Sequence, residues 1–250
     1  MSAAAARRAV IAVLILGWSN FAFAQTADEV IEKHLAALGG RAALAKVKSR
    51  TMTGTIALST PVGELSGPVE VTNMAPNKSR TLIKLDLSAV GAGEMTVDQR
   101  FDGTAGFVAD SMQGNRDISG DQLEGMRNAT FPTPFLDYKE RGVTVELGAK
   151  EKVGARDAFV LTVKSKTGPA VRQLIDAETY LPLRVVTKIE LPQIGTVEQT
   201  SDFSDLRDVD GVKVPFTIKS SSTAQSFTIT LTKVEHNGKI DEALFSKPVK

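Results

Sequence analysis

Most of the chain alternates between apolar and polar side chains with a period of two, beginning near residue 50. Ile83, Leu85 and Leu87, for example, are separated by Lys84 and Asp86. Successive side chains of a strand point to opposite faces, so this pattern predicts strands with one buried and one wet face, as in antiparallel sheets. Turn signals separate the runs, and we expect about ten or eleven strands by these rules. Further alternating runs lie at 69–71, 95–101, 159–163, 183–189 and 227–231, and turn signals at 75–77, 101–103, 208–211 and 236–238.

A helical pattern precedes the strands. Thr26 is a good N-cap, and Gly39 and Gly40 can end a helix, which predicts a helix over 26–38. A second short helix is expected over 41–47. The first helix carries its apolar residues on one face at helical spacing, so that face should pack against the sheet. These residues are Val30, Ile31, His34, Leu35 and Leu38.

The alternation stops between Ser111 and Gly142. Ser119 can start a short helix there, and Pro132 and Pro134 exclude a central strand. The segment is too apolar for a disordered loop. It is therefore either an ordered lid over an apolar surface or a loop that completes the core, and the two are compatible. The lid candidates are Met112, Leu123, Met126, Phe131, Phe135 and Leu136.

Together these patterns predict a mainly β (α+β) fold, a curved antiparallel sheet with helices covering its concave face, in a single domain over 25–250. A long open sheet exposes its edges and an apolar face, and bending it around helices hides both. The bend leaves an apolar cavity that can bind a ligand. Strand side chains of one parity are expected to line it, and the candidates are Val69, Val71, Ile83, Leu85, Met95, Val97, Phe159 and Leu161.

The first 24 residues have the features of a cleavable signal peptide. Arg7 and Arg8 form a basic start, and the apolar run at 10–18 is shorter than the roughly 20 residues that span a bilayer. Small residues around position 23 provide a cleavage site, with Gln25 as the first mature residue. A buried N-terminal helix is the alternative, and the lack of a polar face within the run disfavours it. We expect export to the periplasm.

Net charge and cysteine content limit the partners and the kind of membrane anchor that we expect. Removing Arg7 and Arg8 with the signal peptide leaves 28 basic residues against the 29 acidic ones, a formal charge of −1. Nucleic-acid partners usually require a basic surface, so they are not expected. The chain contains no cysteine, which excludes disulfides and a cysteine-linked lipid anchor. We expect a protein that is free in its compartment.

Candidate catalytic residues are few. The chain has two histidines; His34 should be packed on the first helix, and His236 should be solvated in a hairpin turn. Neither belongs to a zinc motif, and no nucleophile elbow or phosphate loop is present. We therefore expect no metal, no cofactor and no enzymatic activity, with a hydrolase using unrecognised carboxylates as the remaining alternative. An acidic cluster before Gly211 fails the spacing of a calcium loop, and turn contacts are the simpler role for Asp202, Asp205, Asp208 and Asp210.

Several segments of the mature chain are similar to a known group of proteins. A helix ending at 36–40 leads through 46–49 into the first strand, and turn and strand signatures follow at 176–183, 203–215 and 241–245. This arrangement resembles the superfamily of periplasmic outer-membrane lipoprotein-sorting proteins, the Lol-type carriers and receptors. The similarity spans most of the mature chain and concerns the scaffold more than the cargo.

The resemblance implies an incomplete antiparallel β-barrel whose open side is plugged by helices. In that superfamily acyl chains enter the apolar cavity as the lid moves, and a strand arginine holds the lid shut. Arg50, Arg80 and Arg100 are the candidates for that role here. The implied function is a soluble periplasmic carrier or binder of lipoproteins or other acylated ligands, with transient contact to envelope membrane proteins. The alternative is a non-catalytic envelope module, for protein interaction or structure, with a self-filled core.

Overall fold

The computed structural model describes residues 25–60, 63–88, 91–191 and 195–248. The expected signal peptide at 1–24 lies outside these residues. Within the described ranges, no helix combines the length and apolar character needed to cross a membrane.

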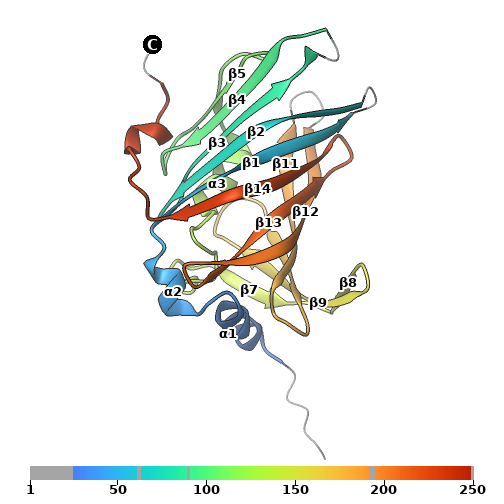
Figure 1. The fold of residues 1–250 in the computed structure, drawn as a ribbon. Coiled ribbons are helices and arrows are strands. Elements are labelled where there is room, and N and C mark those ends of the chain that lie inside the picture. The colour runs from blue at the N-terminus through green and yellow to red at the C-terminus, as the bar shows by residue number, and fades with distance from the viewer. Residues whose placement is uncertain (1–24, 61–62, 89–90, 192–194, 249–250) are drawn as a thin grey trace, which may run out of the picture.

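The fold is one antiparallel sheet of fourteen strands, in the order β6-β5-β4-β3-β2-β1-β14-β13-β12-β11-β10-β9-β7, with β8 paired to β9 (Figure 1). Across the described residues this path has two ends, at β6 and β7, so the barrel is incomplete. The expected curved antiparallel sheet with helices is confirmed. Its elements are α1 (Ala27–Ala37), α2 (Arg41–Lys46), β1 (Ser49–Thr60), β2 (Gly63–Met74), β3 (Lys78–Asp86), β4 (Glu94–Phe101), β5 (Gly106–Asp110), β6 (Arg116–Ile118), α3 (Gly120–Asn128), β7 (Thr144–Leu147), β8 (Glu151–Val153), β9 (Arg156–Lys164), β10 (Val171–Asp176), β11 (Pro182–Leu191), β12 (Gly195–Val209), β13 (Val212–Ser221), β14 (Ser226–His236) and the 3-10 turn η2 (Glu242–Phe245).

The alternating pattern decides which face of each strand turns inward. Met52 of β1 pairs with Val71 of β2 and Val234 of β14. Paired residues of an antiparallel ladder point to the same side. Two glycines of the same parity allow backbones to approach closely, since a Cβ would lie 2.2 Å from the Thr230 carbonyl oxygen at Gly54 and 1.9 Å from the Lys84 carbonyl oxygen at Gly67. Close approach of this kind helps the sheet to curve.

Helix α1 closes one end of the concave face, beside α2 in Figure 1. The Thr26 hydroxyl accepts a hydrogen bond from the Glu29 amide at 3.2 Å, and the Glu29 carboxylate accepts one from the Thr26 amide at 3.0 Å. This capping box satisfies two amides that a helix start leaves free. The inward face of α1 joins a core that includes Phe135 from the loop after α3. The buried α1 residues are Val30, Ile31, His34 and Leu35.

Two sequence predictions about this architecture are wrong. Arg116–Ile118 forms β6 inside the segment that we expected to lack strands, and it pairs with β5. The described residues hold fourteen strands where we expected ten or eleven. Strands β6 and β8 have three residues each, which is too short to give a period-two signal. The short helix expected after Ser119 is confirmed as α3, as are the helices expected at 26–38 and 41–47.

Candidate functional site

A cavity of about 430 Å³ lies between α3 and the concave face of the sheet. One wall is formed by β9, β10 and β11, and β4 contributes Gln99 from the other half of the sheet. Its volume falls within the roughly 300–1,000 Å³ typical of small-molecule sites. The lining residues are Gln99, Asp121, Gln122, Gly125, Met126, Asn128, Ala129, Thr130, Pro134, Val163, Ser165, Pro169, Val171, Gln173, Thr187, Lys188 and Ile189.

Helix α3 is fastened on one side to the turn between β9 and β10. The Asn128 amide donates to the Thr167 carbonyl oxygen at 2.6 Å, and the Thr167 hydroxyl donates to the Glu124 carboxylate at 2.6 Å. The two elements lie close together, since a Cβ at Gly168 would lie 3.0 Å from Glu124 Cβ. All of these contacts involve exposed polar groups.

On the other side, α3 is fastened to the turns of the opposite half of the sheet. The Arg127 guanidinium donates to the Thr104 carbonyl oxygen, through Nη2 at 3.0 Å and Nε at 3.2 Å. Asn77 donates to the Arg127 carbonyl oxygen at 3.2 Å. Helix α3 therefore bridges the open side of the barrel, and none of its residues is fully buried. Surface hydrogen bonds, more than apolar packing, hold it over the cavity.

The loop after α3 connects the cavity to the core under α1. Pro134 lines the cavity, whereas Phe135 is 0% exposed and packs edge-on against the His34 ring, with ring centres 5.5 Å apart. Arg141 braces this loop by donating to Thr130 Oγ1 and to the Pro134 carbonyl oxygen, both at 2.6 Å. Burial lowers the pKa of Arg141 below its usual value. The loop thus connects the cavity, through Pro134, to the filled core, through Phe135.

Solved structures share this architecture. A LolA superfamily protein from Nitrosomonas europaea superposes with a TM-score of 0.55 and 14% identity, over 90% of this chain and 99% of that one. A DUF1329 family protein from Desulfovibrio piger also gives 0.55 and 14%, over 89% and 98%. A domain named for outer membrane lipoprotein sorting, from Vibrio parahaemolyticus, gives 0.53 and 13%, over 87% and 94%.

The chain has the LolA fold. The resemblance seen in the sequence is confirmed at this level. No protein-family model and no curated protein matches the chain.

The strand residues predicted to line a cavity lie on the concave face of this LolA fold, in two groups. Phe159 and Leu161 belong to the core under α1. The cavity beneath α3 is lined instead by Val163, Val171 and Ile189 of the same face, which the sequence did not single out. Val163 has the same parity as Phe159 and Leu161, so the alternation contained a signal for the face but not for the position along it. The second group, Val69, Val71, Ile83, Leu85 and Met95, clusters on β2 to β4, and Val97 follows Met95 on β4.

The lid candidates also lie in different places: at the cavity, at the core under α1 and in an exposed turn. Met126 lines the cavity, and Leu123 lies half-buried on the same helix. Phe131 and Leu136 are half-buried against the core under α1, where Phe135 is fully buried. Met112 is 61% exposed in the turn between β5 and β6, so the structure does not bring it together with the others.

One of the three strand arginines contacts the loop after α3. The guanidinium of Arg50 lies 5.2 Å from the centre of the Phe131 ring, within cation–π distance. Its Nε donates to His236 Nε2 at 3.0 Å. Burial lowers the pKa of Arg50 to about 10, so the group remains charged at neutral pH. Arg50 therefore links β1 to the loop after α3 through this cation–π contact.

The expectation that His236 is solvated is wrong. Its side chain is 1% exposed, because it faces inward beside Arg50. Since Nε2 accepts from Arg50, the neutral ring carries its proton on Nδ1, which lies 3.3 Å from the Asp210 carboxylate. Burial, and then the charge of Arg50, lower the pKa of His236. The residue is a structural partner of Arg50.

Arg80 and Arg100 point to the opposite face of the sheet. They form ion pairs with Asp98, from Arg80 Nε at 2.8 Å and from Arg100 Nη2 at 2.7 Å. Arg100 also donates to the Ser246 carbonyl oxygen, just after η2. Figure 1 shows this C-terminal turn beside β3 and β4. Arg100 fastens the C-terminal segment to the convex side, and Arg80 is joined to Arg100 through their shared partner Asp98.

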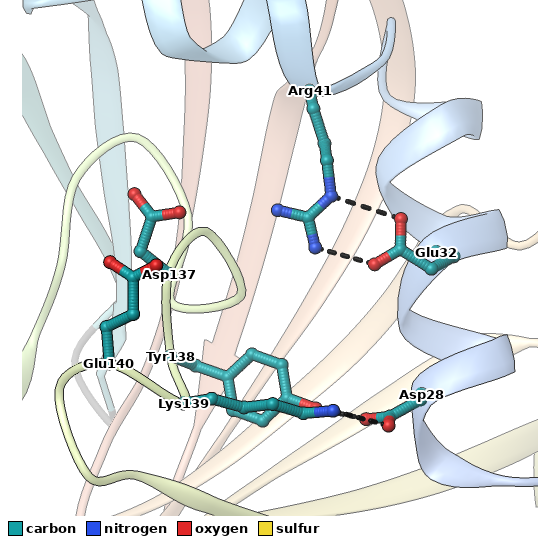
Figure 2. Close-up of a pocket in the computed structure, with 7 residues that line it drawn as sticks. All are labelled: Asp28, Glu32, Arg41, Asp137, Tyr138, Lys139 and Glu140. Carbon is teal, nitrogen blue, oxygen red and sulfur yellow. Dashed lines mark hydrogen bonds and ion pairs between the residues drawn. The ribbon is translucent and has the colours of Figure 1, made fainter.

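A second pocket, of about 240 Å³, lies between α1 and the loop at 137–140 (Figure 2). Arg41 makes a two-pronged ion pair with Glu32, at 2.6 and 3.1 Å, and Lys139 pairs with Asp28 at 2.5 Å. The hydrogen bond from Lys139 is the main cause that lowers the pKa of Asp28, and that from Arg41 lowers the pKa of Glu32. This pocket is charged and contains two ion pairs, so it suits an anchor between helix and loop better than an apolar ligand.

Proposed function

We propose that this chain is a non-enzymatic carrier or binder of acylated molecules, either lipoproteins or lipids, in the cavity beneath α3. The observation that carries the proposal is a cavity of about 430 Å³ with Met126, Val163 and Val171 in its walls, under a helix that has no fully buried residue. Each methylene moved from water into such a cavity contributes about 0.8 kcal/mol. Burial alone therefore supplies affinity for a hydrocarbon chain, without any catalytic group.

In this proposal the ligand enters as α3 moves away from the cavity that it covers. Its tethers are a few exposed hydrogen bonds to the turns at Thr104 and Thr167. Each such bond contributes only about 0.5–1.5 kcal/mol net, because water replaces it on opening. Elements with few buried apolar contacts are the ones that open most easily. Helix α3 is thus suited to act as the lid, with Arg50 holding the loop that follows it.

The proposed compartment, the periplasm, is inferred from the N-terminal sequence. The basic, apolar and small-residue features of 1–24 indicate export, so the carrier would act in the periplasm and contact envelope membranes transiently. A similar fold occurs in a domain named for outer membrane lipoprotein sorting. That likeness supports an acylated cargo as the first class to test.

A reversible lock on α3 tests the proposal. The chain contains no cysteine, so a Glu124→Cys/Gly168→Cys pair introduces the only thiols. The two Cβ positions are 3.0 Å apart, and a small shift of the turn reaches the ~3.8 Å of a disulfide. We expect the oxidised variant to lose uptake of a fluorescent fatty-acyl probe and the reduced variant to regain it.

The single variants are the controls. Gly168 has φ +79°, so a side chain there costs about 1–3 kcal/mol of backbone strain, which Gly168→Cys alone measures. Uptake that survives a fully formed disulfide contradicts the lid. An absence of probe uptake by the wild-type protein, with no acyl species found by native mass spectrometry, contradicts the carrier.

The second candidate function is an envelope module for protein interaction or structure, with a self-filled core. The end of the concave face under α1 favours it, because Phe135, Leu161 and their neighbours fill that end with the protein's own side chains. The same measurements separate the two functions. A protein that purifies empty and takes up no probe supports the module.

A further inference from the structure

We propose that Gln99 and Gln173 form a polar recognition site inside the cavity, which selects a single acyl chain ending in a carbonyl group such as an amide or ester. The inference rests on the proposed function and adds the chemical class of the ligand. The two amides come from opposite halves of the sheet, on β4 and β10, and both line the cavity.

Strand register directs both side chains to the concave face. Gln99 pairs with Thr81 and Val108, and Thr81 pairs with Val71 of the inner face. Gln173 pairs with Leu161, which is buried in the core under α1, and with Val185. Both glutamines are half-buried.

Their hydrogen-bonding capacity is unused within the protein. Among the described residues, neither side-chain amide hydrogen-bonds to another group. A primary amide offers two donors and one acceptor, and desolvating it without partners costs about 1–3 kcal/mol. Gln173 nevertheless lies on the same wall as the apolar Val163 and Val171. A ligand with a carbonyl group would supply the missing partner, whereas a pure hydrocarbon would leave both amides unsatisfied.

Cavity size limits the rest of the ligand. At ~30 Å³ for a water-sized group, about 430 Å³ corresponds to roughly 14 non-hydrogen atoms. That is one medium-length chain with its head group. A lipid with several chains would need α3 displaced throughout its stay, so the closed protein favours single-chain ligands.

Matched ligands and variants test this inference. Decanamide, methyl nonanoate and dodecane, which have equal numbers of non-hydrogen atoms, are competed against a fluorescent fatty-acyl probe. We expect the wild-type protein to prefer the two carbonyl ligands over the alkane. Gln99→Leu and Gln173→Leu should each reduce that preference by about tenfold, corresponding to one hydrogen bond, without weakening the alkane.

Gln199→Leu is the control variant, because Gln199 of β12 pairs with Thr187 of β11 but does not line the cavity. It should leave the preference unchanged, and circular dichroism checks that every variant folds. Equal binding of carbonyl ligands and alkane by the wild-type protein overturns the recognition site while leaving the carrier intact. Failure of every ligand, the probe included, overturns the proposed function itself. A preference that persists in both glutamine variants also overturns the site.

Discussion

Helices α1 and α3 cover the same concave face, yet they are held there by different forces. Helix α1 has a capping box and four buried side chains that join a continuous core. Helix α3 has no side-chain hydrogen bond at its N-cap and no buried residue, and it lies over a cavity. The comparison indicates that the end of the barrel under α1 stabilises the fold, whereas α3 covers the other end and can move away from it.

The amino-acid sequences of α1 and α3 explain why the first is buried and the second is not. The apolar residues of α1 recur at helical spacing, so the helix can bury a full face. In α3, Leu123 and Met126 are the large apolar residues among polar ones, and Gly120 and Gly125 lower its intrinsic helix propensity. A short helix of this composition depends on its tethers, since isolated helices of this length are unstable in water.

The largest expected effect is the loss of a core aromatic under α1. Phe135→Ala should lower the free energy of unfolding by about 3–5 kcal/mol, because the ring is 0% exposed and the cavity left behind cannot collapse fully. Met126→Ala on α3 should cost under about 1.5 kcal/mol, since Met126 is only half-buried beside an existing cavity. Urea unfolding of both variants measures the difference.

For acyl-probe uptake we expect the opposite order, in which Met126→Ala has a larger effect than Phe135→Ala. Met126 lines the cavity, and Phe135 belongs to the core, so we expect Met126→Ala to change uptake in a protein that remains folded. Equal losses of stability in the two variants would remove the distinction between the two ends. A mild effect of Phe135→Ala would return that residue to the lid.

A second difference should appear with pH. Burial lowers the pKa of His34 to about 4, and its Nδ1 donates to the Tyr180 carbonyl oxygen at 2.7 Å. The ring is neutral in the folded state, whereas the unfolded chain takes up a proton below about pH 6.5. Stability is therefore complete above pH 6.5 and is lost as pH falls toward 4. We expect a loss of about 2 kcal/mol between pH 7.5 and pH 5 from this residue.

His34→Leu should flatten the pH dependence of the unfolding free energy, whatever it does to stability at neutral pH. His236→Gln is the matched variant, because the pKa of His236 is also lowered by burial and contributes in the same direction. Two histidines give two resolvable imidazole signals by NMR. A His34 signal that titrates near pH 6.5 in the folded protein would show that α1 is not sealed.

The sequence predicted what depends on local pattern. Helix α1 was predictable because its cap and its apolar period both lie within 26–38. The alternating runs at 83–87, 95–101, 159–163, 183–189 and 227–231 correctly predicted strands β3, β4, β9, β11 and β14. Strand β6, with three residues, was not. The buried contact between Arg50 and His236 joins positions 186 apart, and no local rule links them.

The sequence predicted which face of the sheet lines the cavity, but not where along that face the cavity lies. Alternation identifies Phe159, Leu161 and Val163 as inward residues of one strand, but Val163 alone reaches the cavity beneath α3. Which part of an inner face is covered by packing and which is left hollow depends on the bend of the sheet and on the reach of the loop at 129–143. These are properties of the assembled sheet, so strand register had to be known first.

The smallest expected effect compares the two helix starts directly. Thr26→Ala removes a hydroxyl that accepts from the Glu29 amide, and it should cost about 1 kcal/mol. Ser119→Ala alters the N-cap of α3, where the side chain makes no capping hydrogen bond, and it should cost a few tenths of a kcal/mol at most.

Native-state hydrogen exchange measures the protection of the backbone amides of both helices in each variant. In the wild-type protein, the α3 amides should exchange through local opening well before those of α1. Thr26→Ala should speed exchange in α1 and leave α3 unchanged. If Ser119→Ala destabilises its helix as much as Thr26→Ala does, then α3 relies on its own start as α1 does, and the tethers to Thr104 and Thr167 are not what holds it over the cavity.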